Sequence, residues 1–112
     1  MGDLRALIEA VEAGEVRMSQ CASAFPSESA GGLCTWHRVW AAYNGSLDAA
    51  LALHNALLPG WFPGMSQNIH HGHWFAWVQN KASMHSTAQD NTPARAWLLA
   101  ILRAKEAGHD RT

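Results

Sequence analysis

The residues best suited to chemistry in this chain are histidines that gather in one short stretch. His70, His71 and His73 lie close together in the string NIHHGHW, and His85 follows in the next expected strand. Neutral imidazole is a common zinc ligand, and residues at i and i+2 of a strand lie on one face. His71, His73 and His85 are therefore a candidate metal site, with zinc as its cofactor. The alternative is a polar strand start that tolerates histidine and needs no cofactor.

The expected hairpin geometry bears on this metal site. A hairpin loop at residues 80–81 pairs Ala76 near His85. That register puts His85 on the face opposite His73, which favours the interpretation without a metal. His54 could supply a further ligand, but a histidine on the apolar stripe of a helix is more often a core residue with a backbone hydrogen bond.

Nucleophilic and acid–base catalysis have less support. Cys34 precedes Thr35-Trp36-His37, which puts a thiol near an imidazole without the signature of a catalytic cysteine. Glu9, Glu12 and Glu15 follow a helical i, i+3 spacing that is typical of a solvated face. The sequence has no Gly-x-Ser-x-Gly elbow and no phosphate-binding glycine-rich loop. We therefore predict that the protein is not an enzyme, and we name no catalytic residue.

The composition predicts one globular domain over residues 1–112, without a strong charge of either sign. The chain is 48% hydrophobic and 15% charged, and its net charge is −1. A nucleic-acid partner is not expected, because phosphate binding usually requires a basic excess. No apolar run reaches the roughly 18 residues of a membrane span, and the N-terminus lacks the pattern of a signal peptide. We expect a cytoplasmic protein without a membrane partner, in which Cys21 and Cys34 are free thiols.

Capping residues and apolar periodicity predict the elements that position these residues. Ser46 and Thr92 are expected N-caps, and Asn44-Gly45 is expected to separate two helices. One helix carries its buried stripe on Leu47, Ala50, Leu51, His54, Leu57 and Leu58. A helical N-terminal segment, 1–34, with a flexible loop at 26–32, precedes a helix–sheet–helix core over 35–107.

The middle of the chain predicts a three-stranded antiparallel meander between residues 61 and 88. The expected fold class is α+β, with a small sheet and three to four helices packed mainly on one of its faces. In the aromatic run after His73, Trp74 points to one side with Ala76 and Val78, while Phe75 and Trp77 point to the other.

Aromatic side chains grouped on an uncovered face are typical of a partner-binding surface or a dimer interface. We therefore name His73, Trp74, Phe75 and Trp77 as candidate partner-binding residues. The alternative is that residues 15–34 fold over this face and bury it. Both interpretations remain open at the level of the sequence.

The strings YNGSLDAALALHNALLPGW (43–61) and TPARAWLLAILRA (92–104), with the aromatic middle between them, resemble a family of small bacteriophage and prophage accessory proteins. The resemblance covers residues 35–107. It implies an accessory protein that acts in the cytoplasm of the host, with no catalytic residues to carry over. The string NIHHGHW (68–74) departs from the family, whose middle is variable and often more charged.

Two functions follow as expectations. The first is a non-enzymatic, phage-encoded protein that binds a host or defence-system protein complex, for example as an inhibitor of a CRISPR effector. It could also pair with a second copy of itself. The alternative is a small His-rich metal-binding protein or metal-dependent hydrolase.

Overall fold

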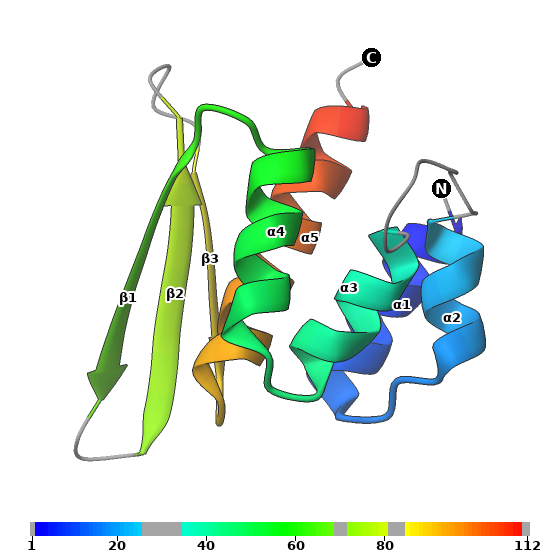
Figure 1. Cartoon of the computed structure of the whole chain (residues 1–112), viewed down its shortest axis with the longest axis horizontal. Coiled ribbons are helices and arrows are strands. Elements are labelled where there is room, and N and C mark those ends of the chain that lie inside the picture. The colour runs from blue at the N-terminus through cyan, green and yellow to red at the C-terminus, as the bar shows by residue number, and fades with distance from the viewer. Residues whose placement is uncertain (1, 26–34, 69–71, 81–84, 111–112) are drawn as a thin grey trace.

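A computed structural model of the chain shows an α+β fold within the residues that it describes, 2–25, 35–68, 72–80 and 85–110 (Figure 1). Side chains are described for 3–25, 35–67, 72–80 and 86–107. The elements in chain order are α1 (Gly2–Ala13), α2 (Met18–Ala24), α3 (Thr35–Tyr43), α4 (Leu47–Leu57), β1 (Phe62–Asn68), β2 (His73–Gln79), β3 (His85–Asp90) and α5 (Pro93–Asp110).

The expected fold class is confirmed. The strands form one antiparallel sheet in the order β1-β2-β3, and the described helices lie on one side of it (Figure 1). Five helices are present in these ranges, where three to four were expected. The short helix α2 also forms, and it buries Cys21 in the core.

The helix boundaries follow the expected capping residues. The Ser46 hydroxyl accepts a hydrogen bond from the Ala49 amide at 3.1 Å, and the Thr92 hydroxyl accepts one from the Arg95 amide at 3.2 Å. These side chains satisfy amides that have no partner within the first helical turn. Gly45 between α3 and α4 has a φ of 107°, a backbone conformation that strongly favours glycine.

The helix α5 is the central element of the fold. It packs against β2 and β3 on one side and against α1, α3 and α4 on the others. A helix surrounded in this way is apolar around most of its circumference. Its buried residues are Ala94, Ala96, Trp97, Leu98, Leu99, Ala100, Ile101, Leu102 and Ala104.

The buried face of α4 differs from the expected one. Leu47 and Leu51 are 43% and 46% exposed, whereas Leu53 is fully buried. Because α4 consists mostly of leucine and alanine, its hydrophobic periodicity does not define one stripe, and the prediction for Leu47 and Leu51 was wrong.

His54 is a satisfied core residue, as predicted. It is 2% exposed, and its Nε2–H donates to the Trp61 carbonyl at 2.8 Å. Its Nδ1 accepts a hydrogen bond from the Trp97 indole N–H at 3.4 Å. Both ring nitrogens are therefore used inside the protein, and His54 is not available as a metal ligand.

The register of the sheet corrects the expected hairpin. Ala76 pairs with Ala88, and His85 pairs with Gln79. The third strand runs from His85 to Asp90, later in the chain than expected. The expected register is therefore wrong by three residues, and an odd shift reverses the face assigned to residue 85.

Candidate protein-binding surface

The two faces of the sheet differ in what covers them. Along β2, Trp74, Ala76 and Val78 lie on the side of the helices, and Ala76 and Val78 are fully buried. The alternate positions, with their partners on β1 and β3, form the opposite side, which we call the outer face. Its described side chains are those of Phe62, Gly64, Ser66, His73, Phe75, Trp77, Gln79, Thr87 and Gln89.

The outer face carries exposed aromatic rings and no formally charged Asp, Glu, Lys or Arg among its described residues. Phe62 is 52% exposed and Phe75 is 38% exposed. The expectation that Phe75 and Trp77 share a side, away from Ala76 and Val78, is confirmed. Phe62 was not among the predicted contact residues, because the expected meander did not assign its first strand to a face.

Trp77 is held against the sheet by a close approach to Gly64, its partner on β1. A Cβ atom added at Gly64 would lie 2.3 Å from the Cε2 and Cζ2 atoms of Trp77. Only a glycine leaves room for the indole at this place. A glycine inside a strand is itself a sequence signal for such an approach, so Gly64 could have been recognised in advance.

The described part of the N-terminal segment does not cover the outer face. Helix α2 packs against α1 and α3, on the far side of the helices from the sheet (Figure 1). Val16, Cys21 and Phe25 are buried in the core on this side of the fold. The alternative in which the N-terminal segment covers Phe75 and Trp77 is therefore wrong for residues 15–25. Residues 26–34 lie outside the described part of the chain.

Trp74 does not belong to the outer face. Its side chain is half-buried and packs against the hydrophobic core on the side of the helices. We therefore assign Trp74 to the core and keep Phe75 and Trp77, with Phe62 added, as the candidate contact residues.

His73 is exposed at the start of β2 and lines a polar hollow of about 270 Å³. The other residues that line it are Glu12, Gln89, Asp90 and Asn91. No group of three His, Cys, Asp or Glu side chains within the described ranges is arranged to bind a metal ion. The hollow is thus a polar margin beside the aromatic part of the outer face.

The structure does not bring His73 and His85, two of the three histidines proposed as one metal site, close together. His85 pairs with Gln79, at the end of β2 opposite to His73. A strand of this length separates the two backbone positions by about 20 Å, which is too far for two imidazoles to bind one ion. His71 lies outside the described residues, and so does the side chain of His85.

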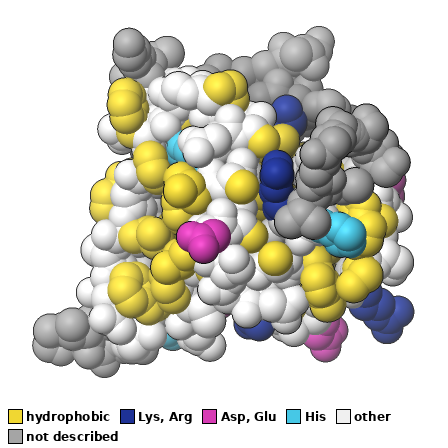
Figure 2. Space-filling view, in the orientation of Figure 1, with side chains coloured by type: hydrophobic (Ala, Val, Ile, Leu, Met, Phe, Trp, Pro, Cys, Tyr) yellow, Lys and Arg dark blue, Asp and Glu magenta, His cyan; other side chains and the backbone are white. Residues whose placement is uncertain are grey.

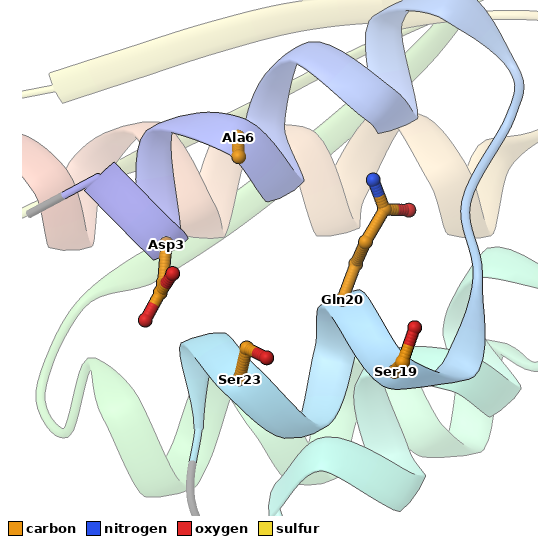
Figure 3. A pocket seen from close by; sticks show the side chains of 5 residues that line it. All are labelled: Asp3, Ala6, Ser19, Gln20 and Ser23. Atoms are coloured by element: carbon orange, nitrogen blue, oxygen red, sulfur yellow. The ribbon is translucent and has the colours of Figure 1, made fainter.

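A second hollow lies between α1 and α2 and measures about 130 Å³ (Figure 3). The residues that line it are Asp3, Ala6, Ser19, Gln20 and Ser23. It could hold about four water molecules, and it is smaller than the cavities of several hundred Å³ that bind organic ligands. We assign it no function.

The other groups considered for catalysis are exposed, engaged or outside the described ranges. Glu9, Glu12 and Glu15 are exposed, as expected for a solvated face, and Glu12 forms an ion pair with Arg103. Cys34 lies outside the described residues, so its expected proximity to His37 is not described.

No protein-family model matches this chain, and neither a curated protein nor a solved structure matches it. Among the described helices, none is long and apolar enough to cross a membrane. The surface properties of the outer face are therefore the main basis for a functional proposal.

Proposed function

We propose that this protein is a non-enzymatic binding protein whose outer face contacts another protein. The observation that carries the proposal is the group formed by Phe62, Phe75 and Trp77. They share one side of the sheet, where no described residue is formally charged and which no described segment covers. Interface cores are enriched in aromatic side chains and depleted of charged ones, and large exposed apolar patches usually mark contact sites.

The chemistry of this face favours a protein over a nucleic acid. Aromatic stacking on single-stranded nucleic acid operates together with a basic groove that follows the phosphates. The outer face offers no described Lys or Arg. Two of the four basic residues near the C-terminus are engaged elsewhere: Arg95 donates to the Tyr43 carbonyl at 2.6 Å and lies over the Tyr43 ring, and Arg103 pairs with Glu12.

We further propose that the partner is a host or defence-system protein complex in the host cytoplasm, and that binding inhibits it. This part rests on the resemblance of residues 35–107 to phage accessory proteins. A bacterial immune complex such as a CRISPR effector is the most concrete target. An inhibitor of this kind needs a surface that binds its target tightly, and it needs no catalytic group. The outer face, which has no formally charged residue among those described, suits this role.

A site-specific crosslinking experiment tests the binding surface. A photoreactive amino acid is placed at Phe75 in one variant and at Met18 in another, and both are expressed in a bacterium that carries a CRISPR system. Met18 is a suitable control because it is 45% exposed but lies on α2, away from the sheet. We expect discrete protein adducts from position 75 and none from position 18. Equal labelling from both positions, or none from position 75, contradicts the proposal.

A cleavage assay tests the inhibitory activity. A purified CRISPR effector is incubated with the chain and with its target DNA, and the cleavage rate is measured. We expect inhibition that Phe75→Ser weakens by about tenfold or more, since a buried aromatic contact contributes at least 1.4 kcal/mol at a contact centre. Met18→Ser should leave inhibition unchanged. If inhibition is absent while position 75 still crosslinks to a protein, the binding surface stands and the proposed target is wrong.

A further inference from the structure

The two edges of the sheet differ in whether side chains bind their backbone groups. At the edge formed by β3, the Arg103 guanidinium donates to the Thr87 carbonyl at 2.9 Å, and Glu12 holds the same guanidinium at 2.5 Å. At the edge formed by β1, no hydrogen bond from another described segment reaches the backbone of the strand. An unpaired edge is a template for pairing with a further strand.

The backbone groups that β1 presents to this edge follow from the register. Pro63 has no N–H, so its position must be one that points away from β2. Alternation then directs the backbone groups of Met65 and Gln67 to the free edge and those of Gly64 toward β2.

The Arg103 contact independently agrees with this alternation. Trp77 pairs with Gly64 on one side and with Thr87 on the other. If Trp77 exchanges hydrogen bonds with Gly64, the Thr87 carbonyl must point to the outside of the sheet, where Arg103 binds it.

Exposed apolar side chains also lie in the helix layer that covers one side of this sheet (Figure 1). Leu47 and Leu51 are separated by one helical turn on α4 and are both more than 40% exposed. Met65 of β1 is half-buried on the same side of the sheet. Figure 2 shows hydrophobic side chains gathered over α4 and over the adjoining part of the sheet. We call Leu47, Leu51 and Met65, with the edge of β1, the edge surface.

We propose that the edge surface binds a second copy of this chain by antiparallel pairing of β1 with β1. With Met65 opposite Met65 of the second copy, each Met65 amide donates to the other Met65 carbonyl. Each Gln67 amide donates to the Pro63 carbonyl of the second copy. The missing N–H of Pro63 then interrupts the paired strands once on each copy.

The chemistry of β1 fits a second copy as the occupant. Antiparallel self-pairing places like residues near one another, and β1 contains no charged residue that would repel its copy. A two-fold axis also brings the two α4 helices toward each other and covers Leu47 and Leu51 on both copies. The only acidic residue of α4 is Asp48, so each copy brings one carboxylate of this helix to the contact.

The size of the edge surface predicts a dimer that dissociates on dilution. The strand is about 20 Å long and the helix layer lies about 10 Å from the sheet, so the contact measures roughly 20 Å by 20 Å. Counted over both copies this is roughly 800 Å², which is below the range of standard specific interfaces and is typical of a weak, transient contact. Pairing at this edge would join the two outer faces into one continuous surface, without covering Phe75 or Trp77.

Sedimentation of the full chain between about 1 μM and about 500 μM tests the proposal, because small interfaces dissociate in this range. We expect a monomer–dimer equilibrium whose dissociation constant rises about tenfold or more in Leu51→Lys. Met18→Lys, which places the same charge at an equally exposed residue of α2, should leave it unchanged. A monomer at every concentration overturns the proposal, as does a dimer that Leu51→Lys does not weaken.

Amide hydrogen exchange then tests which edge pairs. The Met65 and Gln67 amides should exchange more slowly at the higher concentration, and the Gln89 amide on β3 should not change. Protection of the β3 edge in their place contradicts the assignment. Gln67→Pro removes an amide that points to the free edge and should also weaken the dimer. Phe75→Ser should weaken partner binding but not dimerisation. The dimer can therefore be disproved without affecting the proposed function, and the proposed function without affecting the dimer.

Discussion

The indole of Trp77 occupies the space that any side chain at Gly64 would need. The two residues face each other across the β1–β2 pair, so the ring is braced by the backbone of the neighbouring strand. We expect Gly64→Ala to destabilise the protein by about 1–3 kcal/mol, because the added methyl group displaces the ring. Urea unfolding followed by circular dichroism measures the change.

A double-mutant cycle separates this clash from other effects of alanine. In a Trp77→Ala background, Gly64→Ala should be neutral or stabilising by about 0.5 kcal/mol, since alanine costs less backbone entropy than glycine in a strand. Equal destabilisation in both backgrounds would show that the space beside Gly64 is not reserved for the indole.

His54 contributes to stability through two buried hydrogen bonds, to the Trp61 carbonyl and from the Trp97 indole. We expect His54→Ala to cost about 2–4 kcal/mol, because it leaves both buried partners unsatisfied and opens a cavity. Trp97→Phe removes only the longer of the two bonds and should cost less, about 1 kcal/mol of hydrogen bonding beyond its change in volume. Thermal unfolding of both variants measures the two losses of stability. If His54→Ala destabilised the protein less than Trp97→Phe does, this account would be contradicted.

The fold was predictable where local signals are strong. Ser46 and Thr92 cap their helices with their own hydroxyls, and Gly45 has the positive φ that separates two helices, so the sequence predicts these helix boundaries. The apolar circumference of α5 also predicts a buried helix. Alternation alone predicts which residues of β2 share a face. Because both faces of this strand carry apolar residues, alternation does not predict which face the helices cover.

The remainder depended on contacts between distant segments. The register of β2 and β3 is fixed by the packing of both strands on α5. A hairpin loop at residues 80–81, predicted without that packing, misplaces His85 by three residues. The exposure of Leu47 and Leu51 depends on which side of α4 meets α3 and α5, which a leucine- and alanine-rich helix does not specify. No sequence pattern connects Arg103 with Thr87, since the contact exists only after β3 has packed beside α5.

Arg103 protects the edge of β3 by binding both Glu12 and the Thr87 carbonyl. We expect Arg103→Gln to destabilise the protein by about 1 kcal/mol and to increase aggregation on heating, because the carbonyl at the edge loses its donor. Light scattering during a thermal ramp measures the aggregation.

Arg5→Gln is the matched control for Arg103. Arg5 pairs with Glu106 across α1 and α5, but its side chain is 59% exposed and no backbone carbonyl is involved. An exposed pair of this kind contributes about 0–1 kcal/mol. If Arg5→Gln and Arg103→Gln aggregate alike, the effect comes from lost surface charge and not from the edge of the sheet.

Burial in α2 raises the pKa of the Cys21 thiol from its ordinary value of 9.0 to about 11. Because the folded protein binds this proton more tightly than the unfolded chain does, the stabilising effect is complete below pH 9 and is lost as the pH rises toward 11. We expect the free energy of unfolding to fall by about 2–3 kcal/mol over that interval, and Cys21→Ala to remove this part of the pH dependence. In a Cys34→Ser background, Cys21 should also resist alkylation at pH 8 and react fully in urea. Rapid alkylation of the folded protein at pH 8 would contradict the burial of this thiol.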